Sequence, residues 1–101
     1  MIKSNISSKE KLSICFDELA RIEKLLKRQK EKIAYNWNSR SEWQYWLGYS
    51  CTEGNQPEEK KYRKLVLEYE QTIKIRENEF QELHNQYMQK KREIESLIKK
   101  L

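Results

Sequence analysis

Apolar residues recur at alternating steps of four and three residues along the second half of this chain. A stripe with a period of about 3.5 residues is typical of a left-handed coiled coil. We therefore predict a helix over about residues 57–100, capped by Asn55 or Gln56, with Pro57 at its first position and Glu58 and Glu59 at the positive end of its dipole. The seam positions of this helix are Tyr62, Val66, Tyr69, Ile73, Arg76, Phe80, Leu83, Tyr87, Lys90, Ile94, Leu97 and Leu101.

The first part of the chain carries a similar pattern. Ser7 and Glu10 have the spacing of a capping box, in which each residue satisfies a backbone amide of the other. The three-and-four spacing that follows predicts a helix over about residues 8–40, although the regular spacing fades near Asn36. The seam positions of this helix are Leu12, Cys15, Leu19, Ile22, Leu26, Gln29 and Ile33.

The segment between the two helices is rich in aromatic side chains. Ser41 and Gln44 form a second capping box, and Gly48 is a natural helix stop. These signals predict a short aromatic helix and a turn over residues 41–56, or a continuation of the first helix beyond a kink. Without that continuation the second helix would be the longer one, and its apolar end would lack a partner within the chain.

Composition narrows the fold class further. The chain has 101 residues, of which 37% are hydrophobic, and it contains only 2 Gly and 1 Pro. So few turn-forming residues exclude sandwiches, barrels and βαβ folds. We predict a single all-α domain over residues 1–101, an antiparallel helical hairpin or coiled coil.

A partner chain is expected because two helices that bury one stripe each cover too little apolar surface for so small a fold. A second copy, giving a homodimeric helix bundle, is the simplest solution by symmetry. Arg76 and Lys90 interrupt the seam, where they either fix the register or extend past it to water. Apolar residues also lie off the seams, at Ile14, Leu25, Leu67, Ile75 and Met88. The expected dimer or partner seam comprises Phe80, Leu83, Tyr87, Ile94, Leu97 and Leu101.

Catalytic chemistry finds little support in the sequence. His84 is the single histidine, and no Cys/His cluster or Gly-rich loop is present, so we expect no enzyme, no cofactor and no metal site. The sequence shows no signal peptide and no membrane span, so the sequon at Asn5 carries no weight. Cys15 and Cys51 are too far apart for a bridge in a continuous helix, which predicts free thiols in a reducing cytoplasm. The richness in Lys, Glu, Asn, Ile and Tyr suits an AT-rich genome, so we expect a bacterial or virus-infected cell.

The net charge of +5 belongs almost wholly to the first helix. Residues 1–40 carry 10 basic and 5 acidic side chains, whereas residues 57–101 carry 11 and 9. This excess is interpreted as a solvated coiled-coil face, or as a patch that attracts nucleic acid or an acidic protein surface; the first interpretation is favoured. The basic patch comprises Lys24, Lys27, Arg28, Lys30 and Lys32.

Aromatic residues are concentrated in the middle of the chain. They could form a small core at the end of the hairpin, with Trp43, Trp46 and Leu47 facing inward, or they could anchor a binding surface. With Arg40 they could also stack on unpaired bases. We expect a mixture, in which at least Tyr45 or Tyr49 stays available. The candidate partner-binding residues are Tyr35, Trp37, Arg40, Trp43, Tyr45, Trp46 and Tyr49.

The sequence Trp46-Leu47-Gly48 near the centre of a chain of this length resembles the Trp-x-Gly helical-hairpin family of small type VII secretion substrates. The resemblance implies a helical hairpin that forms an antiparallel dimer, with the motif at the turn. Members of that family also carry a Tyr followed four residues later by an acidic residue. In this sequence, Lys91 follows Tyr87 at that spacing.

The leading functional hypothesis is a non-enzymatic module that binds another protein through coiled-coil surface and the aromatic turn. One alternative is a nucleic-acid-associated factor, such as a small phage-type inhibitor of host nucleic-acid machinery, of which anti-CRISPR proteins are an example. A further alternative is a helical-hairpin substrate of the type VII kind.

Overall fold

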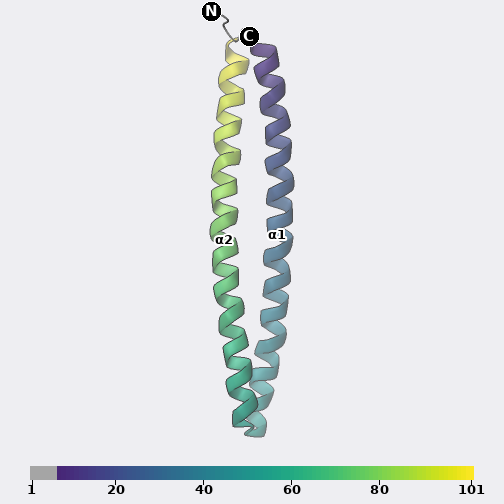
Figure 1. The fold of residues 1–101 in the computed structure, drawn as a ribbon, viewed down its shortest axis with the longest axis vertical. Coiled ribbons are helices and arrows are strands. Elements are labelled where there is room, and N and C mark those ends of the chain that lie inside the picture. Colours follow the sequence, from purple (N-terminus) through teal and green to yellow (C-terminus); the bar gives the residue numbers. More distant parts are fainter. Residues whose placement is uncertain (1–6) are drawn as a thin grey trace, which may run out of the picture. The chain divides into compact units, whose positions relative to one another are not determined.

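The computed structural model describes residues 7–101, which form an all-α helical hairpin. Helix α1 spans Ser8–Glu53 and helix α2 spans Gln56–Lys99, with 46 and 44 residues. Figure 1 shows the two helices, coloured from purple to teal in α1 and from green to yellow in α2. The predicted fold class is therefore confirmed. The sequon at Asn5 lies outside the described residues.

Helix α1 is longer than predicted. It continues without a break through the aromatic segment to Glu53, so the prediction that it ends near Arg40 and that a short separate helix follows is wrong. Gly48 lies inside the helix instead of ending it. A single interior glycine costs about 1 kcal/mol relative to alanine. The burial of Leu47 on the α2 side of the helix outweighs that cost.

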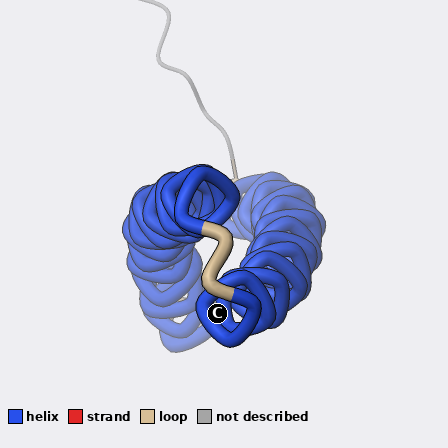
Figure 2. Tube along the Cα trace, turned by 90° about the horizontal axis from the view of Figure 1, so that it is seen from below, coloured by secondary structure: helices blue, strands red, loops and turns tan. Residues whose placement is uncertain are grey.

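The turn between the helices consists of Gly54 and Asn55 (Figure 2). The amide of Asn55 donates to the carbonyl of Ser50 at 3.0 Å, and the amide of Gly54 donates to that of Cys51 at 3.2 Å. These two bonds define a Schellman motif, which requires a left-handed residue after the helix. Gly54 supplies it with a φ of 69°. The stop signal is thus Gly54 and not Gly48.

Side-chain caps begin both helices as the sequence predicts. The hydroxyl of Ser7 accepts a hydrogen bond from the amide of Glu10 at 3.2 Å. The side-chain oxygen of Asn55 accepts one from the amide of Glu58 at 3.3 Å, so Asn55 caps α2 directly after ending α1. A connection of two residues leaves the two helices antiparallel neighbours.

The chain divides into two compact units. Within the described residues, the first unit combines the part of α1 up to Lys27 with α2 from Gln81 onward. Its core contains Cys15, Ile22 and Ile94. At the apolar C-terminal end of α2, Ile94 is buried and Leu97 half-buried against the chain, whereas Ile98 is 50% exposed.

The second unit is residues 28–80 and includes the turn. Its apolar core contains Leu47, Val66 and Ile73, and Ile73 is only 2% exposed. Ion-paired and aromatic contacts join the same two helices, including Arg40 with Glu70. The prediction of one domain over residues 1–101 stays a prediction.

The seam of α1 keeps its heptad spacing to the end of the helix. Where the sequence analysis expected the spacing to fade, polar residues simply take over the seam positions. Gln29, Asn36 and Ser50 are buried at 6%, 7% and 1% exposure, and Arg40 is half-buried. Every seventh residue is thus buried or half-buried in the series Cys15, Ile22, Gln29, Asn36, Trp43 and Ser50.

The two glycines give opposite predictions for alanine substitution. Gly48→Ala should raise the free energy of unfolding by about 1 kcal/mol, because the position is helical and nothing lies within 4 Å of an added Cβ. Gly54→Ala should lower it by about 1 kcal/mol, because alanine is strained at a positive φ. Urea denaturation of both variants checks the pair. Destabilisation by Gly48→Ala would contradict the continuous helix.

Candidate interaction surface

The aromatic residues near the turn divide between the seam and the outside of α1. Trp43 lies at the seam and stacks on Tyr62 with ring centroids 5.6 Å apart. Of the two alternatives for Trp46, packing inward with Leu47 or anchoring a binding surface, the exposed one is observed, with 40% of its surface accessible. Tyr45 and Tyr49, at 67% and 53%, are exposed as well. Both rings contact Trp46 edge to face, at 5.4 and 5.9 Å. We call Tyr45, Trp46 and Tyr49 the aromatic patch.

Arg40 is committed to the hairpin. Its Nε and Nη2 donate to one carboxylate oxygen of Glu70 at 3.1 and 2.8 Å. The guanidinium also lies 5.5 Å from the ring centroid of Trp37, which is 43% exposed. Stacking of Arg40 on unpaired bases was one possibility that the sequence raised. Because Glu70 and Trp37 already occupy the guanidinium, Arg40 is poorly placed for it.

The six residues predicted as a dimer or partner seam are covered within the chain, with one exception. Ile94 is buried, and Phe80, Leu83, Tyr87 and Leu97 are half-buried. Leu101 lies two residues beyond the end of α2 at Lys99 and is 67% exposed. A free docking surface therefore has to be sought away from this seam.

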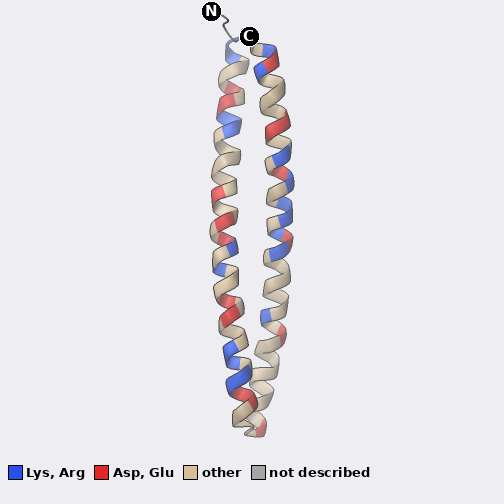
Figure 3. Ribbon diagram, in the orientation of Figure 1, with Lys and Arg blue, Asp and Glu red and all other residues tan. Residues whose placement is uncertain are grey.

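The basic patch does not form a single stripe. All five of its residues are exposed, and none forms an ion pair within the described part of the chain. They occupy five different positions of the heptad, so their side chains project around the helix rather than along one face. Figure 3 shows the Lys and Arg positions along both helices in blue. A protein that follows a nucleic-acid backbone usually gathers its cations on one face.

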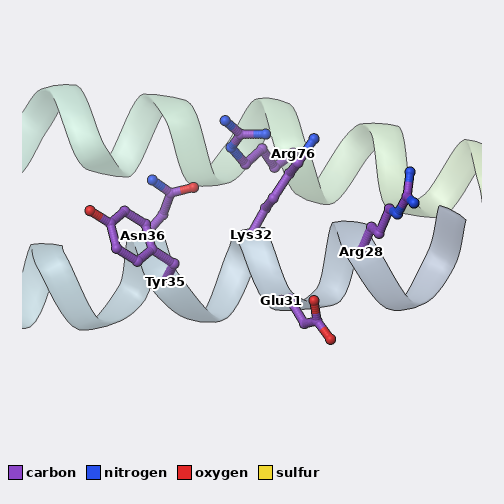
Figure 4. Close-up of a pocket in the computed structure, with 6 residues that line it drawn as sticks. All are labelled: Arg28, Glu31, Lys32, Tyr35, Asn36 and Arg76. Atoms are coloured by element: carbon purple, nitrogen blue, oxygen red, sulfur yellow. The ribbon is translucent and has the colours of Figure 1, made fainter. Parts of the chain in front are cut away.

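A groove of about 360 Å³ lies between the helices of the second unit (Figure 4). Three cations line it, Arg28 and Lys32 from α1 and Arg76 from α2, together with Tyr35 and Asn36. Glu31 is the one carboxylate at its border, and its side chain points away from the other five. We call the set of Arg28, Lys32, Tyr35, Asn36 and Arg76 the cationic groove.

One polar atom in the cationic groove is buried without a hydrogen-bond partner among the described residues, the Nε of Arg76. Asn36, beside it, is only 7% exposed. Buried polar groups in proteins are normally paired, so the Nε of Arg76 marks an incompletely satisfied position in the groove.

Part of the cationic groove and part of the aromatic patch lie on one face of α1. Starting at Arg28, steps of four and three residues lead along this face to Tyr49, and every position except the half-buried Ser39 is exposed. We call this series the outer stripe. It comprises Arg28, Lys32, Tyr35, Ser39, Glu42, Trp46 and Tyr49. The outer stripe was not among the predicted sites, although counting heptad positions away from the seam reveals it in the sequence.

Lys90 joins the helices of the first unit. Its ammonium forms ion pairs with Glu18 of α1 and with Glu93, the latter at 2.9 Å. The hydrogen bonds that Lys90 donates to Glu18 and then Glu93 raise the pKa of Lys90 above its usual value. The bond from Lys90 lowers the pKa of Glu93. Of the two roles predicted for Lys90, this geometry supports the fixing of register.

Cys15 belongs to the same cluster. Its thiol donates to Glu93 at 3.5 Å, and burial, followed by that hydrogen bond, raises the pKa of Cys15. Cys51 is exposed, and both cysteines are free. A buried thiol with a raised pKa is a weak nucleophile.

Comparison of the chain with protein-family models, with curated proteins and with solved structures finds no match. The Trp46-Leu47-Gly48 sequence lies inside α1, whereas the type VII substrates it resembles carry this motif at the turn. No helix among residues 7–101 is long and apolar enough to cross a membrane. In the same range, no group of three or more His, Cys, Asp or Glu residues is placed to hold a metal ion.

The two buried amides of the α1 seam should respond differently to leucine. Asn36→Leu should raise the free energy of unfolding by about 1 kcal/mol, because it places an apolar side chain at a seam position that is only 7% exposed. Gln29→Leu should give no gain, because Gln29 donates to the carbonyl of Arg76 at 3.0 Å and to Glu79 at 3.3 Å. Urea denaturation measures both. Equal increases in the free energy of unfolding for the two variants would contradict the distinction between Asn36 and the hydrogen-bonded Gln29.

Lys90→Met should make the free energy of unfolding less dependent on pH in the acidic range. Because the pKa of Glu93 is lowered from its usual value of 4.5, ionised Glu93 stabilises the fold at pH values above 4.5. This stabilisation is lost as the pH falls through the lowered pKa. Since Glu18 and Glu93 are about half exposed, we expect the free energy of unfolding of the wild type to fall by only about 0.5–1 kcal/mol between pH ~6 and ~3. Lys90→Met should not show this decrease. Urea titrations across this range test it, with Lys91→Met as control. Parallel profiles for wild type and Lys90→Met would contradict the assignment.

Proposed function

We propose that the protein is a non-enzymatic interaction module that binds another protein through the outer stripe and the aromatic patch of α1. The observation that carries this proposal is the exposure of Trp46 between Tyr45 and Tyr49 on a face with heptad spacing. Tryptophan and tyrosine are the most frequent anchors of binding hot spots.

The aromatic patch is suited to binding because its rings are already held in place. Trp46 makes an edge-to-face contact with each tyrosine, and all three stand on a helix. Fewer rotamers are therefore lost when a partner packs against them, which lowers the entropic cost of association. The indole N–H of Trp46 and the hydroxyl groups of the two tyrosines can stay at the solvated rim of such a contact.

The spacing of the outer stripe favours a helical partner. A series of residues at steps of four and three is the geometry that a neighbouring helix requires for knobs-into-holes packing. An amphipathic helix from another protein would therefore lie along α1, with apolar residues against the aromatic patch and acidic ones near Arg28 and Lys32.

A nucleic-acid-associated role is the second candidate, including a small phage-type inhibitor of host nucleic-acid machinery. It is supported by one observation, the three cations of the groove that lack ion pairs. The spread of the basic patch around α1 argues against it. An inhibitor that binds the protein components of such machinery would use the same aromatic patch.

Photo-crosslinking tests the leading proposal. A photoreactive phenylalanine analogue in place of Tyr45 should form an adduct with one discrete protein in the producing cell, and the adduct should resist nuclease. Trp46→Ser with Tyr49→Ser should reduce the yield at least ~10-fold, as expected of hot-spot residues. Circular dichroism should be unchanged, because these side chains lie outside the seam.

The matched control is Trp37→Ser, which removes an exposed tryptophan from a different flank of α1 and should leave the yield unchanged. The analogue at Gln44, which is exposed beside the patch on that other flank, should give no adduct. A nuclease-sensitive adduct would favour the nucleic-acid role. Equal yields from the Trp46 and Trp37 variants would contradict the proposed binding surface.

A further inference from the structure

The cationic groove lacks a carboxylate that would neutralise it. Arg28 and Lys32 form no ion pair within the described residues, and Glu31 points away. A cluster of like charges without a counter-charge is unfavourable, and it attracts an anionic group from outside the chain. We propose that this group is Glu42 of a second copy, in an antiparallel homodimer that packs outer stripe against outer stripe.

Glu42 is itself without a partner. It is exposed, it forms no ion pair or hydrogen bond with another described residue, and residues 41–56 contain no Lys or Arg. The same unit of the chain thus presents unpaired cations at one point of the outer stripe and an unpaired carboxylate at another.

The spacing of these charges fits a twofold axis. Arg28 and Glu42 each lie seven residues from Tyr35, one before it and one after it. An axis through Tyr35 places Arg28 of each copy opposite Glu42 of the other, so the two ion pairs form together. A parallel arrangement would place Arg28 against Arg28 and Glu42 against Glu42, which like-charge repulsion opposes.

The proposed axis passes through an exposed aromatic residue, since Tyr35 is 68% exposed. Its neighbours on the outer stripe are Lys32 and Ser39. Tyrosine is enriched in the core of protein–protein interfaces, and charged pairs usually lie toward their rim, as Arg28 and Glu42 would here.

The inference goes beyond the proposed function, because it assigns a second copy of the chain as the partner and pairs Arg28 with Glu42, although it uses the same outer stripe. Its test uses the purified chain alone, whereas the crosslinking test reports on another protein. A monomer that still captures its partner through Trp46 would refute the dimer and leave the proposed function standing.

Charge exchange tests the pairing. Sedimentation velocity from about 1 to about 100 μM should show a concentration-dependent dimer for the wild type. Arg28→Glu and Glu42→Arg should each raise the dimer dissociation constant at least ~10-fold, because each creates two like-charge contacts. The double variant should return to within about threefold of wild type, since it restores both pairs with reversed polarity.

Glu31→Arg is the matched control, because it changes an exposed carboxylate of the same helix that points away from the groove; it should leave the dissociation constant unchanged. Circular dichroism of each variant confirms that the helices persist. A wild type that stays monomeric at the highest concentration overturns the proposal. A double variant no stronger than the single variants overturns it as well.

Discussion

The rest of the structure depends on one constraint, the requirement that α1 present the same side to α2 along its whole length. The heptad repeat of α1 meets this requirement even where its residues are polar, as at Gln29, Asn36 and Arg40. The contacts of α2 adapt to those residues: Glu70 pairs with Arg40, and the carbonyl of Arg76 accepts from Gln29. Packing periodicity therefore determines the helix, and local stop signals such as Gly48 do not.

That constraint also determines which side chains remain outside. Once Trp43 and Leu47 are directed to the seam, Tyr45, Trp46 and Tyr49 must point away from it, because they occupy other heptad positions. The polar stretch of the seam has a second consequence, since its buried amide and guanidinium border a groove that the chain leaves unneutralised. The heptad packing that joins the two helices thus also determines where the proposed binding surfaces lie.

The sequence was sufficient to predict the fold class, the seam of α2 and the caps at Ser7 and Asn55, because each depends on local spacing and chemistry. It misplaced the end of α1, because Ser41, Gln44 and Gly48 imitate a helix boundary while the opposing packing energy comes from α2. Two alternatives for Trp46, core or binding surface, stayed open in the sequence, because the register of α1 beyond Arg40 was not fixed. The groove was out of reach, since it combines Arg76 with residues distant in sequence.

Amide hydrogen exchange, resolved by residue, tests the continuity of α1 most directly. The account predicts that the amides of residues 41–50 are protected nearly as well as those of residues 20–33, because one helix packed on α2 includes both segments. Rapid exchange between Asn38 and Gly48, with protection resuming only in α2, would contradict it. In that case the heptad positions of the outer stripe and the aromatic patch would not share one helix face.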